Sequence, residues 1–241
     1  MSLVETDWLE KNLYNVKIID CSWHMPQTKR NGLKEYKLKH IPNAIFFDLD
    51  DNSKKDIDLP HMLVDLDEWE KIVSKMGIKK NDKIIVYDNS DVISSCRCWF
   101  NFIYYGHDPD LIHVLNGGFA KWIKENRKIT NEELILDTSN YRSFEKKELV
   151  KDKNFIDQNI KSQKFKVIDA RSKDRFEGKI PEPRKGLRSG SRSNSSCIPF
   201  NNCLNKDKTF KKKEELKDIF NSSVKDINEN NIVFSCGSGV T

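Results

Sequence analysis

The chain has 241 residues, a length that accommodates one large domain or two of modest size. Hydrophobic residues make up 37% of the composition and charged residues 33%, which excludes a disordered chain because there is enough apolar side-chain surface for a core. The 42 basic and 37 acidic residues are interspersed and leave a net charge of +5, which argues against a dedicated nucleic-acid-binding protein.

The composition also bears on location and on metal binding. The first ten positions carry three acidic residues, where a secretory or organellar targeting peptide is basic or apolar. No stretch approaches the ~18 consecutive apolar residues of a membrane-spanning helix. The six cysteines lack the paired spacing of a zinc site and are expected to be free thiols. We therefore expect a cytoplasmic protein with no membrane or nucleic-acid partner, no cofactor and no metal.

Apolar runs and helical patterns alternate along the first half of the chain. Residues 16–20 form a short apolar run that ends in an acid, which predicts a buried strand with a polar tip. Residues 67–75 have apolar side chains at helical spacing. The next expected elements are a strand, a buried helix, a strand and an amphipathic helix, over residues 83–88, 94–105, 111–115 and 119–126.

The second half repeats this order, with expected strands over residues 166–169 and 232–235 and a helix over 214–221 between them. The two strands follow their counterparts in the first half at offsets of 149 and 147 residues, which indicates a duplication. Because strands alternate with helices, the repeat predicts two tandem α/β domains, each a mostly parallel sheet flanked by helices.

The expected domains are residues 1–128 and 154–241, joined by a polar linker over 129–153. Only six residues follow the last expected strand, whereas the first copy continues with a helix, a strand and a helix. On the logic of the repeat, the second domain is C-terminally incomplete, as a fragment or as a natural truncation. This leaves open whether residues 1–241 alone are active.

Cys236 begins the sequence CGSGVT directly after the last expected strand. A glycine-rich loop at the carboxyl end of a strand can point successive backbone N–H groups at one centre, and a following helix would add its positive end. Both effects favour a thiolate, so Cys236 is the candidate nucleophile. In the first copy the aligned position is close to Asn89, so that copy is expected to lack thiol chemistry there.

This loop resembles the active-site loop of the tandem rhodanese-like sulfurtransferases of the 3-mercaptopyruvate type. Further segments similar to the family's motifs occur in the family's order: HIPNA at 40–44, LPHML at 59–63, LNGGF at 115–119, and the arginine-containing stretches at 169–176 and 181–184. The resemblance implies two rhodanese domains, a non-catalytic first and a catalytic second. The polar run at 190–195 departs from the family, because it stands where the second copy of the HIP motif is expected.

The resemblance implies a role for each matching residue. Cys236 would take up sulfur and become a persulfide. Arg175 and Arg184 match the pair that holds the substrate's carboxylate and keto oxygen, a task that suits the planar guanidinium fork. The remaining loop residues expected to contact the substrate are Gly237, Gly239, Val240 and Thr241.

The resemblance also implies a proton relay and a choice of substrates. Ser238 is expected to work with His61 and Asp50, because a histidine passes a proton at neutral pH and an acid orients it. Gly237 and Ser238 are neutral where the thiosulfate-preferring branch is basic, so 3-mercaptopyruvate is the favoured small-molecule sulfur donor and thiosulfate the second. The expected acceptor is a thioredoxin-like dithiol, another thiol or cyanide.

Two other functions remain open from the sequence. One is a catalytically inactive rhodanese-like module for binding or regulation, which the incomplete second domain and the departure at 190–195 favour. The other is a cysteine phosphatase, which also holds its nucleophile in a backbone cradle. That enzyme would need an arginine farther along the loop and a histidine at the position of Ser235, so a sulfurtransferase is the preferred prediction.

Overall fold

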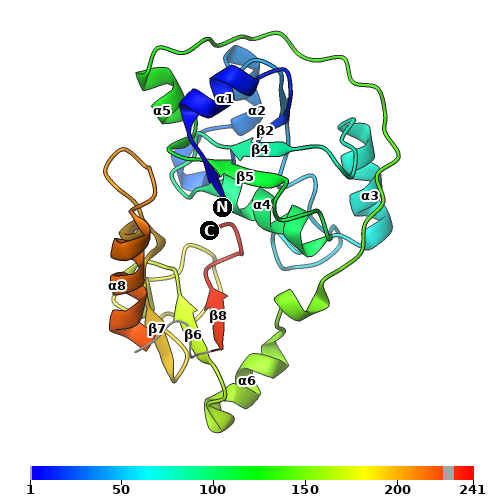
Figure 1. Cartoon of the computed structure of the whole chain (residues 1–241). Helices are drawn as coiled ribbons and strands as arrows, with labels where there is room; N and C mark the ends of the chain where they lie inside the picture. Colours follow the sequence, from blue (N-terminus) through cyan, green and yellow to red (C-terminus); the bar gives the residue numbers. More distant parts are fainter. Residues whose placement is uncertain (1, 225–230) are drawn as a thin grey trace. The chain divides into compact units, whose positions relative to one another are not determined.

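The computed structural model describes residues 2–224 and 231–241. Their contacts divide the chain into two compact units, Met1–Leu149 with Val240–Thr241, and Val150–Gly239. Each unit contains a sheet whose strands all run parallel and are accompanied by helices (Figure 1). This confirms the α/β class expected from the alternation of strands and helices.

The first unit contains a five-stranded sheet in the order β1-β5-β4-β2-β3. Its strands are β1 (Leu3–Val4), β2 (Lys17–Asp20), β3 (Ala44–Phe46), β4 (Ile84–Tyr87) and β5 (Ile112–Leu115). Its helices are α1 (Thr6–Asn12), α2 (Gly32–Leu38), α3 (Leu66–Lys75), α4 (Ser94–Tyr104) and α5 (Gly118–Lys124), with 3-10 turns η1 (Pro26–Thr28) and η2 (Lys147–Leu149). The elements expected over residues 16–126 are confirmed, with ends that differ by one or two residues.

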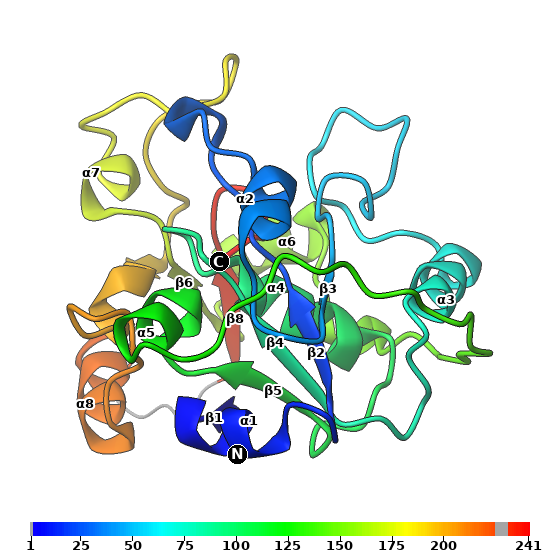
Figure 2. The ribbon, with the colours of Figure 1, turned by 90° about the horizontal axis from the view of Figure 1, so that it is seen from above.

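Both faces of this sheet are covered. Helices α1, α2 and α5 pack on the face seen in Figure 2, where Leu9 and Trp122 are fully buried. Helices α3 and α4 lie on the other face, where the Trp69 ring stacks 4.5 Å from that of Tyr105. Because both faces are buried, the central strands are continuous runs of Ile and Val rather than alternating apolar and polar residues.

The segment expected as a linker packs for most of its length on the first unit. Thr130 pairs with His40 in an isolated antiparallel bridge. Tyr141 is buried, and its hydroxyl lies 3.0 Å from Nδ1 of His107. Backbone hydrogen bonds and single side chains thus anchor an extended chain that has no apolar period. The division between the units falls after Leu149, and the domain bounds expected from the sequence stay a prediction.

The second unit contains, among its described residues, a three-stranded sheet in the order β7-β6-β8. Its strands are β6 (Lys166–Asp169), β7 (Ser195–Cys197) and β8 (Ile232–Ser235). Its helices are α6 (Lys153–Ser162), α7 (Lys173–Phe176) and α8 (Lys213–Val224), with a 3-10 turn η3 (Phe200–Cys203). Strand β7 begins at the last residue of the polar run at 190–195, so the chain enters a strand directly after the departure from the family's motif.

The central strand pairs of the two sheets have the same register. In each pair an acidic residue at the end of one strand lies opposite the last residue of the next; the pairs are Asp20 with Tyr87 and Asp169 with Ser235. Asp88 and Cys236 therefore follow equivalent strand ends. The position equivalent to Cys236 is thus Asp88, next to Asn89, close to which the sequence comparison placed it.

Buried acids hold the loops at the strand ends of the first unit. Asp20 accepts hydrogen bonds from the backbone N–H and the hydroxyl of Ser22, at 2.9 and 2.5 Å. Asp88 accepts corresponding bonds from Ser90 and a further one from the N–H of Ser95 at 2.7 Å. Burial raises the pKa of Asp20 to about 6, with a further rise from nearby Asp88, while the bonds from Ser22 oppose the shift.

In the second unit the corresponding acid begins a chain of four alternating charges. Asp169 pairs with Arg171 at 2.7 Å, Arg171 with Glu182 at 2.8 Å, and Glu182 with Arg175 at 2.5 Å. The Glu182 side chain is 4% exposed, and its pKa is lowered chiefly by the hydrogen bond from Arg175. These ion pairs connect the end of β6 to the irregular segment that follows α7.

The raised pKa of Asp20 predicts a pH-dependent stability. Between about pH 4 and 6 the folded chain binds a proton on this carboxyl that the unfolded chain has released, so the contribution of Asp20 to stability falls as the pH rises. The difference in unfolding free energy, Asp20→Asn minus parent, should therefore increase by roughly 1 kcal/mol for each pH unit across this window. Denaturant unfolding at a series of pH values measures the difference, and a constant difference would contradict the prediction.

The buried position of Glu182 predicts a large effect of its removal. Glu182→Ala leaves two arginines without their shared partner and should lower the unfolding free energy by about 3 kcal/mol in denaturant titrations. Glu177→Ala is the matched control, because Glu177 pairs with Lys179 at the surface and should matter little. Equal effects of the two variants would show that Glu182 does not stabilise the unit through its ion pairs.

Candidate active site

Cys236 follows β8 at the edge where the parallel strands β6 and β8 end together. Its Sγ accepts a hydrogen bond from the backbone N–H of Gly239 at 3.1 Å. Gly239 has a φ of 72°, a left-handed conformation that glycine adopts without steric cost. The loop therefore turns a backbone N–H group back toward the sulfur.

Two arginines converge on Gly237, the residue after the cysteine. Arg184 donates from Nη2 to the Gly237 carbonyl oxygen at 2.7 Å. Arg175 lies against the Gly237 α-carbon, because a Cβ added there would be 2.9 Å from Arg175 Nη2. Glu182 holds Nε and Nη2 of Arg175 at 3.2 and 2.5 Å. A larger residue at 237 would displace this guanidinium from the loop.

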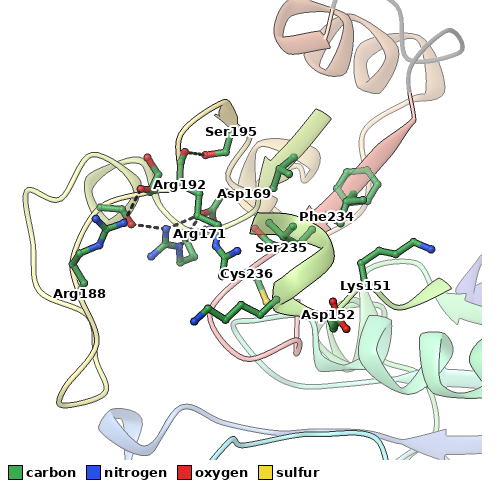
Figure 3. A pocket seen from close by; sticks show the side chains of 16 residues that line it. Lys151, Asp152, Asp169, Arg171, Arg188, Arg192, Ser195, Phe234, Ser235 and Cys236 are labelled. Carbon is green, nitrogen blue, oxygen red and sulfur yellow. Dashed lines mark hydrogen bonds and ion pairs between the residues drawn. The ribbon is translucent and has the colours of Figure 1, made fainter. Parts of the chain in front are cut away.

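Cys236 also lines a cavity of about 420 Å³ in the second unit (Figure 3). The charged lining is mainly basic; it consists of Lys151, Lys153, Arg171, Arg188 and Arg192, with Asp152 and Asp169. In the view of Figure 3, the Cys236 side chain lies between Arg171 and Asp152. Arg175 and Arg184 are not among the described residues that line this cavity, so both reach the loop outside it.

In the first unit, His61 and Asp50 form the pair expected for a proton relay. His61 Nε2 lies 3.0 Å from Asp50 Oδ1, and this contact is the main cause of a lowered pKa of the Asp50 carboxyl. Trp23, which the sequence analysis did not single out, donates from Nε1 to the same oxygen at 3.0 Å. Its ring also packs edge-on against the imidazole, with centroids 4.9 Å apart. Trp23 and Asp50 together fix the orientation of His61.

The second ring nitrogen of His61 has a different environment. Nδ1 is buried and has no hydrogen-bond partner within the part of the chain that the structure describes. Because Nε2 faces Asp50, Nδ1 is the ring nitrogen left without a partner among the described residues. Ser238 belongs to the other unit, so its role in the relay stays a prediction.

Val240 and Thr241, the last two residues of the loop, are grouped with the first unit by their contacts, and their role at the substrate stays a prediction.

The six cysteines are free thiols, as expected. Over residues 2–224 and 231–241, no group of three or more His, Cys, Asp or Glu side chains could hold a metal ion, and no helix is long and apolar enough to cross a membrane.

Comparison with known proteins identifies the family. The family model of the rhodanese-like domain matches residues 5–125. The thiosulfate/3-mercaptopyruvate sulfurtransferase 1 of Arabidopsis thaliana, named as mitochondrial, is 36% identical over 99% of this chain and 68% of its own length. The 3-mercaptopyruvate sulfurtransferase of Mus musculus is 31% identical over 100% of this chain and 82% of its own length.

A solved structure agrees with these relatives. The crystal structure of SseA from Escherichia coli, described under the rhodanese fold of 3-mercaptopyruvate sulfotransferases, matches with a TM-score of 0.89 at 27% identity and covers 100% of this chain and 90% of that one. These proteins confirm the resemblance drawn from the sequence motifs and the expectation of a sulfurtransferase enzyme; they give no support to an inactive module or a cysteine phosphatase. The chain therefore belongs to the rhodanese-like family of thiosulfate and 3-mercaptopyruvate sulfurtransferases.

Proposed function

We propose that this chain transfers sulfur from 3-mercaptopyruvate, with thiosulfate as a poorer donor, through a persulfide on Cys236 to an acceptor thiol. The observation that carries the proposal is the hydrogen bond from the Gly239 N–H to the Cys236 sulfur, in a loop flanked by Arg175 and Arg184. The relatives named for the two donors support this choice of substrates.

The first half-reaction moves the donor's sulfur to the cysteine. The Cys236 thiolate attacks the sulfur of 3-mercaptopyruvate, and an S–S bond forms as the C–S bond breaks. The electron pair of the C–S bond stays on carbon, which leaves as the enolate of pyruvate. A proton delivered through Ser238 and His61 converts the enolate to pyruvate. Meanwhile Arg175 and Arg184 hold the carboxylate, because a guanidinium can bind two oxygens at once.

The second half-reaction restores the free cysteine. An acceptor thiolate attacks the outer sulfur of the persulfide, and the Cys236 thiolate leaves. With a thioredoxin-like dithiol, the second thiol then displaces hydrogen sulfide and the acceptor becomes a disulfide; with cyanide the product is thiocyanate. A cytoplasmic location is part of this proposal, although the Arabidopsis relative is named as mitochondrial.

The balance of charge beside the loop supports a monocarboxylate donor. Gly237 and Ser238 are neutral, and Glu182 offsets the charge of Arg175. Neutral residues at these two loop positions suit the one negative charge of a carboxylate better than the two charges of thiosulfate.

Cys236→Ser should abolish sulfide release from 3-mercaptopyruvate in the presence of a dithiol, because a hydroxyl cannot form a persulfide. Cys197→Ser is the matched control, since Cys197 lies in β7 of the same unit and its Sγ faces the Arg171 carbonyl at 3.6 Å. This variant should keep most of the activity. Appreciable turnover by Cys236→Ser would show that another thiol carries the sulfur.

Arg175→Lys should lower kcat/KM for 3-mercaptopyruvate by at least about tenfold, because lysine keeps the charge but cannot bind two carboxylate oxygens in one plane. Steady-state kinetics with Arg142→Lys as the control measures the effect, since Arg142 is exposed in the first unit and pairs with Glu70. Unchanged kcat/KM in both Arg175→Lys and Arg175→Ala would remove Arg175 from the donor site.

A further inference from the structure

His61 has a backbone conformation that residues other than glycine rarely adopt. Its φ is 57°, in the left-handed region where the Cβ atom is crowded by the backbone. The residue is buried, with 8% of its surface exposed. Such conformations persist only where surrounding contacts hold them, and they concentrate at functional sites. The backbone of His61 therefore requires contacts of its own, in addition to those that orient its ring.

Arg97 supplies such a contact. It lies in α4, is half-buried, and donates a hydrogen bond from Nη2 to the carbonyl oxygen of His61. The next carbonyl along the chain, that of Met62, accepts a hydrogen bond from the backbone N–H of Lys54 at 2.9 Å. Both peptide groups that follow His61 are therefore held in place, and Arg97 is the side chain that holds the first of them.

Helix α4 also contacts the segment that carries Trp23. The hydroxyl of Ser94, the first residue of α4, accepts a hydrogen bond from the backbone N–H of Trp23 at 3.0 Å and donates one to the Cys21 carbonyl at 2.6 Å. The Trp23 ring in turn bonds Asp50 and packs edge-on against the imidazole of His61. One helix therefore contacts both the backbone of His61 and the backbone of its aromatic neighbour.

The start of α4 is fixed by the loop that carries an acid in place of the cysteine. Asp88 accepts a hydrogen bond from the backbone N–H of Ser95 at 2.7 Å. The hydroxyl of Ser90 accepts one from the backbone N–H of Ser94 at 3.1 Å. Asp88 and Ser90 are both buried. Because the first residues of the helix are fixed in this way, Arg97 extends from a defined position.

We propose that Arg97 is a positioning residue for sulfur transfer, which holds the left-handed backbone of His61 and thereby places the imidazole for proton delivery to the enolate of pyruvate. Arg97 acts on the reaction only through His61. This inference rests on the proposed function, because it takes His61 as part of the relay, and it adds to that relay a residue that the sequence analysis did not single out.

The two half-reactions separate this role from a general loss of structure. In a single turnover with the full chain in excess over 3-mercaptopyruvate, Arg97→Met should slow pyruvate formation about tenfold, the lower end of what a hydrogen bond to a charged group contributes. Sulfide release by dithiothreitol from the preformed Cys236 persulfide should keep the parent rate, because that step takes no proton from His61. Slowing of both half-reactions alike would overturn the inference.

Lys80→Met is the matched control, because the Lys80 ammonium also donates to a backbone carbonyl in the first unit, that of Gly106, at 2.6 Å. It should leave both half-reactions at the parent rate. Slowing of pyruvate formation by Lys80→Met as large as that by Arg97→Met would overturn the inference, because the effect would then follow from the loss of any such bond.

A double-mutant cycle tests whether the effect of Arg97 passes through His61. His61→Asn should itself slow pyruvate formation, because the imidazole is lost while asparagine tolerates the left-handed backbone. Adding Arg97→Met to His61→Asn should then cause no further slowing. Equal slowing by Arg97→Met in both backgrounds would overturn the inference, as would the parent rate in His61→Asn.

Histidine NMR of the full chain tests the inference without any turnover. The chain has five histidines, and the Cε1–H signal that is missing from His61→Asn belongs to His61. Because the Trp23 ring lies edge-on to the imidazole, with centroids 4.9 Å apart, a displaced imidazole changes the chemical shift of this signal. The signal should move in Arg97→Met and stay in Lys80→Met. An unmoved signal in Arg97→Met would overturn the inference.

Should Arg97→Met fail to fold, Arg97→Lys keeps the charge and one donor group on a shorter stem. It should move the His61 signal and slow pyruvate formation measurably, and parent values of both would overturn the inference. Failure of the proposed function is seen separately, as sulfide release by Cys236→Ser.

Discussion

The backbone after β8 must turn back on itself so that an N–H group faces the sulfur of Cys236, and glycines cannot hold such a turn by their own side chains. Contacts from outside the loop stabilise the turn instead. Arg184 donates a hydrogen bond to the carbonyl of Gly237, and Arg175 fills the space beside the Gly237 α-carbon. Glu182 fixes Arg175 in turn. The parallel sheet supplies the fixed reference for all of them, because β6 and β8 end at one edge.

Most of the first unit's fold could be predicted from the sequence because helices cover both faces of its sheet. A strand buried on both faces must be a continuous apolar run, and all four residues of β4 are buried. The segment over 129–149 could not be predicted in this way. An extended chain that packs through single side chains such as Tyr141 shows no period in the sequence, so its polar composition suggested a linker.

Some residues of the candidate site could likewise be predicted from the sequence, and others could not. Cys236 and its glycines are neighbours in sequence, so the loop pattern alone indicated a candidate nucleophile, whereas its role in sulfur transfer came from the family resemblance. Trp23 and Glu182 could not be found that way, because their partners are reached through irregular segments; Trp23 bonds Asp50 across 27 positions. An acid in a loop is usually solvated, yet Glu182 is buried because two arginines compensate its charge.

The carboxylate of Asp88 has a consequence for how much sulfur the protein carries. It occupies the cysteine position of the first unit and accepts the backbone N–H groups of Ser90 and Ser95, so that loop keeps its hydrogen bonds without a thiol. A carboxylate cannot take the place of the cysteine thiol as the carrier of a persulfide sulfur. On the proposed chemistry, the duplicated architecture therefore has a stoichiometry of one transferable sulfur atom per polypeptide, and donor and acceptor must be served in alternation at that single atom.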